Sequence, residues 1–165
     1  MRWGPFSSYA DLMFFYEYLF VRASLVYLVY AATLGFLFYL EPGWMGFLRS
    51  SHVHAGTVGF FLNLAFGVAY WMMPRPGQIK QPGLEAATFY TLNAGLLLRL
   101  VLEPYALLHP APALQTWLAF GALLQLVAVL IFVYAMHRRV VTNQMLWKLR
   151  KMREARQKHG NEERT

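Results

Sequence analysis

Four long apolar stretches constrain this chain more than any other feature of its sequence. A helix needs about 20 apolar residues to cross the roughly 30 Å hydrocarbon core of a bilayer. Stretches of that size occur four times in the 165 residues, and the sequence is 58% hydrophobic and only 14% charged. This composition is typical of membrane-embedded chains rather than of soluble domains. The sequence therefore predicts an all-α integral membrane four-helix bundle, with spans at approximately 19–40, 55–73, 86–108 and 114–136.

The distribution of charge predicts the orientation of these spans. After the last span, residues 138–164 hold three lysines and six arginines against three glutamates, which accounts for most of the net charge of +7. Because cytoplasmic segments of membrane proteins carry an excess of lysine and arginine, we expect the C-terminus to be cytoplasmic. An even number of spans then places the N-terminus and the 74–85 connection, with Arg75 and Lys80, on the same side. The positive charge thus reports topology in the cell (inner) membrane, and we expect no nucleic-acid partner.

The chain after residue 140 has the pattern of a basic amphipathic helix. Val141, Met145, Leu149 and Met152 recur at helical spacing, with lysines and arginines on the opposite side. Such a helix is typical of a segment that lies on an anionic leaflet, with docking onto a partner subunit as the alternative. We therefore divide the chain into a transmembrane domain, 1–140, and a basic cytoplasmic tail, 141–165.

Polar and ionisable residues inside the spans are few. Because such groups are costly in a bilayer, each one indicates either a functional site or a paired structural role. The chain has no cysteine, which excludes thiolate metal sites and cysteine-ligated iron–sulfur clusters. The residues concerned are Arg22, His52, Asn63, Asn93, Arg99 and Glu103, together with His54 beside His52 and His109 at the end of the third span.

His52 and His54 stand at the start of the second span. At about 100° per residue, two positions along a helix are about 200° apart, so the two rings cannot bind one metal through the same face. The face that continues from His52 is nearly free of side chains. Either another helix packs closely against it, or it gives room for a flat ligand such as a porphyrin. The residues of this face are Gly56, Gly59, Asn63 and Gly67.

Arg99 and Glu103 are four residues apart on the third span and therefore share a helix face. They lie at the depth of His52 on the antiparallel second span. A cation at this position would pair with haem propionates, or the two residues form an ion pair that holds helices together. His109 follows at the same end of the span and is a candidate second haem ligand.

Two runs in and beside the second span are distinctive: Arg49 to Phe61, RSSHVHAGTVGFF, and Gly67 to Arg75, GVAYWMMPR. They resemble the second transmembrane helix of the catalytic subunit of haem–copper oxidases and nitric oxide reductases, closest to the cbb3-like branch, and the resemblance covers roughly residues 1–80. It implies that His52 is an axial ligand of a low-spin haem b. Arg22, Tyr27 and Gly35 in the first span are similar to that family's first helix.

The chain departs from this family in the second half of its sequence. The later helices that bring the copper-binding histidines and the high-spin haem ligand have no counterpart here, so we do not expect oxygen or nitric oxide reduction at a binuclear centre in this chain alone. What the resemblance leaves is a haem b site whose second ligand comes from His109, from His54 or from a symmetry-related protomer.

We therefore expect a membrane haem b protein that acts in electron transfer or in binding a small gas such as O2 or NO. Its partners would be the lipid bilayer and either further copies of the chain or respiratory-complex subunits. The rival hypothesis is a cofactor-free accessory or scaffold subunit of a larger respiratory membrane complex. In that case the glycines, asparagines and the Arg99–Glu103 pair would be devices of helix packing.

Overall fold

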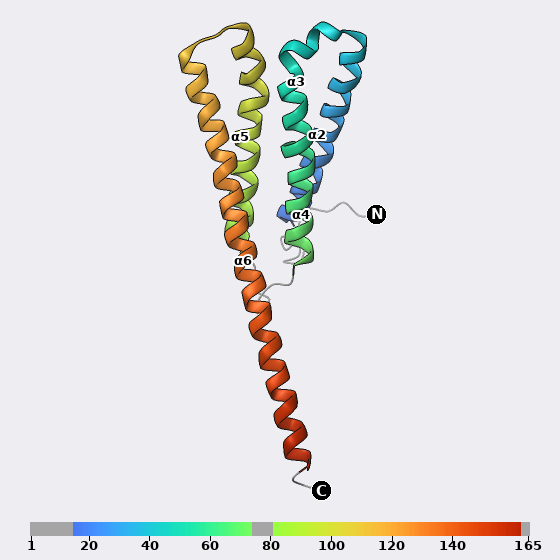
Figure 1. Ribbon diagram of the computed structural model, residues 1–165, viewed down its shortest axis with the longest axis vertical. Coiled ribbons are helices and arrows are strands. Elements are labelled where there is room, and N and C mark those ends of the chain that lie inside the picture. Colours follow the sequence, from blue (N-terminus) through green and yellow to red (C-terminus); the bar gives the residue numbers. More distant parts are fainter. Residues whose placement is uncertain (1–14, 74–80, 163–165) are drawn as a thin grey trace, which may run out of the picture.

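Prolines begin the second, third and fourth helical segments, as their fixed φ and missing amide donor favour. The computed structural model describes residues 15–73 and 81–162, and no strand occurs within those ranges. Its elements are α2 (Phe15–Leu40), the 3-10 helix η1 (Pro42–Trp44), α3 (Met45–His54), the π-helix η2 (Ala55–Leu62), α4 (Asn63–Met72), α5 (Pro82–Leu108) and α6 (Pro112–Glu162) (Figure 1).

Within residues 15–73 and 81–162, four helical segments are long and apolar enough to cross a membrane, which agrees with the four predicted spans. The first, third and fourth are α2, α5 and the Pro112–Arg139 part of α6. The second runs from Pro42 to Met72 and consists of η1, α3, η2 and α4 in succession. It therefore begins well before the predicted residue 55 and includes both histidines within its helical turns.

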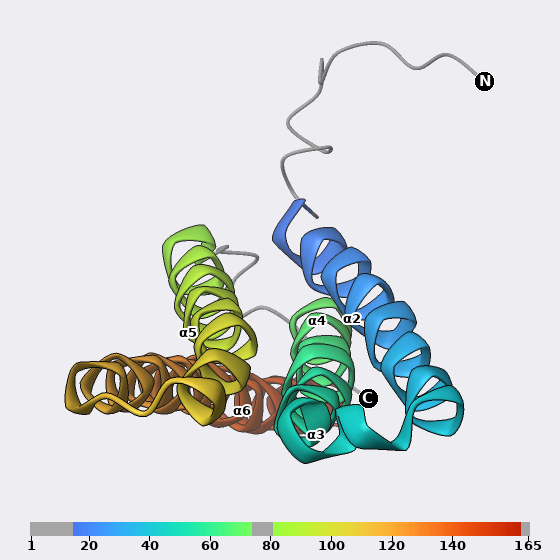
Figure 2. The same ribbon diagram turned by 90° about the horizontal axis from the view of Figure 1, so that it is seen from above.

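The helices form two hairpins that pack against each other. α2 packs on η2 and α4, α3 packs on α5, and α5 packs along α6. Seen from above, α2 lies on one side, the α5–α6 hairpin lies on the other, and α3 and α4 lie between them (Figure 2). We call the end with the two short connections, 41–44 and 109–111, the loop end, and the opposite end the tail end (Figure 1).

An aromatic cluster joins the two hairpins toward the tail end. The rings of Phe66 on α4 and Phe132 on α6 are stacked with centroids 3.8 Å apart, and Phe20 on α2 packs edge-on against Phe66 at 6.3 Å. Tyr70, fully buried, packs against both Phe20 and Phe132. Three helices thus meet through four aromatic rings, which place a large apolar contact area at one level of the molecule.

The α5–α6 hairpin depends on a close glycine contact. A Cβ added to Gly95 would lie 2.5 Å from the backbone oxygen of Gly121, and one added to Gly121 would lie 3.1 Å from the oxygen of Gly95. Small residues at helix crossings allow this kind of backbone approach in membranes.

α6 continues without a break across residue 140. The helix has 51 residues, and it runs on past the predicted fourth span in nearly the same direction (Figure 1). The separate helix expected from residue 141 is therefore the far part of α6. The side chains of 140–146, 149 and 155–165 lie outside the described ones, and with them most of the predicted apolar stripe of the tail; Met152 of that stripe is exposed.

Candidate functional site

His52 faces α2. Its Nδ1 lies 3.0 Å from the backbone oxygen of Ala31, and its ring meets the Phe38 ring edge-on at 5.6 Å between centroids. Because a carbonyl oxygen can only accept, Nδ1 carries the hydrogen and Nε2 of the neutral ring keeps a free lone pair. Among the described residues no hydrogen bond uses Nε2.

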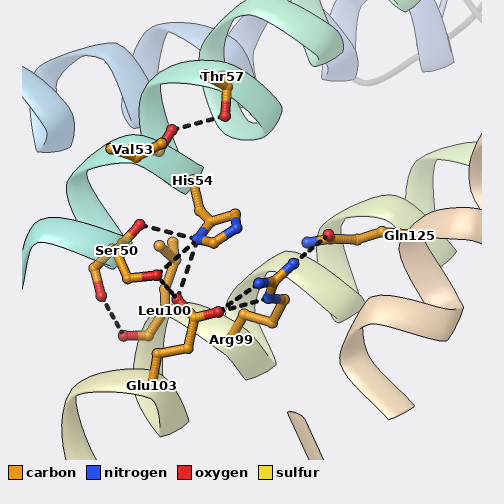
Figure 3. Close-up of polar contacts among 9 residues, drawn as sticks. Ser50, Val53, His54, Thr57, Arg99, Leu100, Glu103 and Gln125 are labelled. Atoms are coloured by element: carbon orange, nitrogen blue, oxygen red, sulfur yellow. Dashed lines mark hydrogen bonds and ion pairs between the residues drawn. The ribbon is translucent and has the colours of Figure 1, made fainter. Parts of the chain in front are cut away.

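His54 faces α5 instead. Its Nδ1 lies 3.1 Å from Oε2 of Glu103 and 2.9 Å from the backbone oxygen of Ser50 (Figure 3). Both of these atoms accept, so Nδ1 carries the hydrogen here as well. The two histidines thus belong to different helix interfaces, in agreement with the 200° separation expected from their spacing.

Glu103 is the centre of a polar network at the loop end (Figure 3). Ser50 Oγ donates to its Oε2 at 2.6 Å, and Nε and Nη2 of Arg99 lie 2.7 Å from its Oε1. Nη1 of Arg99 continues to Oε1 of Gln125 on α6 at 3.3 Å. The network therefore joins α3, α5 and α6, and it satisfies a carboxylate that is only 11% exposed.

The glycine face beyond His52 is mostly occupied. A Cβ added to Gly59 would lie 2.6 Å from the Tyr27 ring, and one added to Gly67 would lie 2.8 Å from Cβ of Phe20. Gly56 alone has nothing within 4 Å of an added Cβ. Close packing of α2 accounts for Gly59 and Gly67, so within this chain these two glycines leave no room for a flat ligand.

The π-helix η2 follows His54 directly and ends at Leu62, immediately before Asn63. The Asn63 amide donates to the backbone oxygens of Val58 and Gly59, at 3.1 and 3.0 Å, while its Oδ1 accepts from Asn93 at 3.0 Å. π-helical turns occur often at functional sites. Here every fourth residue from Ser51 to Gly67 lies on the buried side of the helix. The Asn63–Asn93 hydrogen bond joins α4 to α5, which is the paired structural role expected as one alternative for polar residues inside spans.

His109 does not meet the other two histidines. It is exposed just beyond the end of α5, and its ring is stacked on Tyr105 with centroids 4.7 Å apart. No hydrogen bond or ring contact within the described part of the chain joins His109 to His52 or His54, and no group of three or more metal-ligating side chains occurs there.

One buried charged cluster was not predicted as a site. Arg139, 2% exposed, donates through Nη2 to Glu85 Oε1 at 2.7 Å and through Nη1 to the backbone oxygen of Tyr70 at 3.0 Å. The Tyr70 hydroxyl lies 2.9 Å from Thr88 Oγ1. In the sequence, Arg139 is one of the basic residues that follow the fourth predicted span. The spacing of four residues between Ala135 and Arg139 indicates the buried position of Arg139, because residues four apart share one face of a helix and Ala135 is buried.

Comparisons with protein-family models, with curated proteins and with solved structures gave no match.

Proposed function

We propose that the chain is a multi-pass haem b protein of the cell membrane in which His52 is an axial ligand of the iron. The observation that carries the proposal is the bond between His52 Nδ1 and the Ala31 carbonyl, which leaves the lone pair on Nε2. Histidines that bind metals almost always donate their other ring N–H to a carbonyl or carboxylate, and neutral imidazole is a common axial haem ligand. The resemblance of residues 49–75 to the haem-ligating helix of haem–copper oxidases supports the same role.

Along the glycine face of the described residues, room for such a group is limited to the loop end. Gly56, one helical turn from His52, has open space beside it, whereas the rings of Tyr27 and Phe20 fill the face at Gly59 and Gly67. Most of the wall around a haem would therefore come from outside this chain. A second copy of the chain or a respiratory-complex subunit would supply that wall and the second ligand.

The chain's own residues have distinct roles in this proposal. His52 would hold the iron, and the Ala31 carbonyl would orient the imidazole. Haem b would supply one-electron transfer or the binding of O2 or NO. The Arg99 guanidinium donates hydrogen bonds to Glu103 and Gln125, and it lies on the side of α3 that carries His54. To pair with haem propionates, as expected, Arg99 would have to give up these hydrogen bonds.

A cofactor-free scaffold subunit of a respiratory membrane complex is the second candidate. It is favoured by the packing of Gly59 against Tyr27 and by the bond between Asn63 and Asn93, both of which hold helices together without any ligand. In this case His52 would be a half-buried hydrogen-bonding residue of the α2–α3 contact.

An absorption spectrum of detergent-purified protein, made under haem-replete conditions, separates the two candidates. Sharp reduced α and β bands would support haem binding, and colourless protein would rule it out in favour of the scaffold. His52→Ala should abolish or strongly shift the bands, while His54→Ala, which disrupts the Glu103 contact instead, should change them less. The opposite order would assign the ligand to His54.

A third variant tests where the second ligand comes from. Since His109 makes no contact with His52 in the chain, His109→Ala should leave the bands of the purified protein unchanged if a different subunit or residue supplies the ligand. Loss of six-coordinate character in His109→Ala would instead make His109 the ligand, from the same chain or a second copy.

A further inference from the structure

We infer that Gly35 on α2 is a positioning residue, which sets the orientation of the His52 ring and thereby the direction of its Nε2 lone pair. The inference rests on the proposed function, because a ligating Nε2 is what makes this orientation matter. Three residues of α2 meet the ring, namely Ala31, Gly35 and Phe38. Their spacing of four and three places them on one face of the helix.

The Ala31 carbonyl determines which ring nitrogen carries the hydrogen. Within α2 this carbonyl already accepts the amide of Gly35, four residues on, by the regular helical bond. The His52 Nδ1–H, at 3.0 Å, therefore uses the second lone pair of the same oxygen. A side chain that projected from the helix surface beside that oxygen would crowd the imidazole.

Gly35 provides that bare surface. A Cβ at this position would lie 3.3 Å from Cε1 of His52 and 3.8 Å from its Nδ1. Cε1 is the ring carbon between the two nitrogens, so a methyl group would press on the edge that both donates to Ala31 and carries the ligating lone pair. The Phe38 ring, 5.6 Å away, contacts the same imidazole and restricts how the ring can turn in response.

Gly35→Ala should therefore move the ring by a few tenths of an ångström. Metal–ligand distances are normally held to within about 0.2 Å, and changes in the groups that orient a ligating histidine cost about 10- to 100-fold in affinity. We expect haem retention to fall about tenfold and the reduced α band to shift. Alanine is the best helix former, so the substitution favours the helix itself.

Two other glycines give matched controls. Gly46 on α3 has nothing within 4 Å of an added Cβ, so Gly46→Ala should keep the wild-type spectrum and haem retention. Gly59→Ala would collide with Tyr27 at 2.6 Å and disturb the α2 packing without any direct contact with His52. A spectral change in Gly35→Ala at wild-type thermal stability, with Gly46→Ala unchanged, would support the positioning role. Bands and haem retention equal to those of wild type in Gly35→Ala would overturn it.

A measurement on the haem-free protein separates this inference from the proposed function. Nitrogen-15 NMR of histidine-labelled protein reports which ring nitrogen carries the hydrogen, and His52→Ala identifies the His52 signal. We expect His52 to carry it on Nδ1 in wild type and in Gly46→Ala, and the His52 signals to shift in Gly35→Ala. Colourless wild-type protein would reject haem binding, whereas an unchanged His52 signal in Gly35→Ala would reject the positioning role.

Discussion

Two arginine–glutamate pairs of nearly equal geometry lie at opposite ends of the molecule. In both, the shortest nitrogen–oxygen distance is 2.7 Å. Arg139 and Glu85 are 2% and 1% exposed and come from different helices, whereas Arg99 and Glu103 are 23% and 11% exposed and lie on one helix. The tail-end pair is sealed inside the fold, while the loop-end pair is within reach of solvent or a ligand and contacts His54.

The difference in burial indicates different roles. Arg139 contacts Glu85 at the start of α5 and the Tyr70 oxygen near the end of α4, where helix carbonyls lack intrahelical partners. Its guanidinium also lies over the Tyr70 ring, 4.9 Å from the centroid. One side chain of α6 therefore holds the ends of two other helices, which is a structural role. The loop-end pair contacts the His54 imidazole and is the more accessible of the two pairs.

The largest effect should come from breaking the tail-end pair. Arg139→Gln removes the cation that contacts the buried Glu85 carboxylate, and removing one partner of a buried pair costs about 3–5 kcal/mol. We expect a strong decrease in thermal stability, measured by circular dichroism of the detergent-solubilised protein. The spectrum of any bound haem should change little in the fraction that remains folded.

The neighbouring Arg138 gives the control for this variant. Arg138 is exposed and contacts Tyr134 on its own helix, so Arg138→Gln removes the same charge with little loss of stability. Replacing both buried partners, Arg139→Met with Glu85→Leu, should recover much of the lost stability because neither variant side chain leaves a charge unpaired. A double variant as unstable as Arg139→Gln would contradict this explanation.

The loop-end pair should contribute less to stability. Glu103→Gln removes the charge that Arg99, Ser50 and His54 share, and the loss of hydrogen bonds to a charged group amounts to about 1–3 kcal/mol. Arg99 is partly exposed and can turn toward water, which reduces the cost. Thermal unfolding in detergent should therefore place this variant between Arg139→Gln and wild type.

Glu41 provides the matched control at the same end of the molecule. It is exposed in the short connection after α2, so Glu41→Gln should unfold like wild type. If Glu103→Gln destabilised the protein as much as Arg139→Gln, the distinction between an open and a sealed pair would be wrong.

The number and type of helices followed from the sequence because lipid imposes a simple rule of length and apolarity. The four apolar stretches predicted four spans, and four helices of that kind are present. The start of the second span at Pro42 was not predicted, since the 41–51 segment is too polar to be recognised by hydropathy. The π-helix was not predicted either, because a turn of this kind depends on how Asn63 satisfies the carbonyls that the wider turn releases.

For the candidate site, the sequence predicted the helix face on which each side chain lies better than it predicted the residues that the side chain contacts. Helical spacing placed His52 and His54 on different faces, and the Arg99–Glu103 pair followed from its spacing of four. The partners Ala31 and Glu103 depend on which helices are neighbours, and hydropathy does not contain this information. The burial of Arg139 was missed for the same reason, because its partner Glu85 is 54 residues away in the sequence.

The smallest effect should come from the neutral pair between the two ends. Asn63 and Asn93 share one hydrogen bond of 3.0 Å, and such bonds between membrane helices are worth about 0.6 kcal/mol on average. A double-mutant cycle with Asn63→Ala and Asn93→Ala measures this coupling. The single Asn63→Ala change should cost more than Asn93→Ala, because Asn63 donates to two backbone oxygens in the π-helix, those of Val58 and Gly59, whereas Asn93 donates to one, that of Phe89. If the two single variants were equally stable, the satisfaction of those two carbonyls would not depend on Asn63. If this coupling energy were larger than the loss of stability in Glu103→Gln, the asparagine pair would contribute more to stability than the loop-end pair, which is the opposite of the expected order.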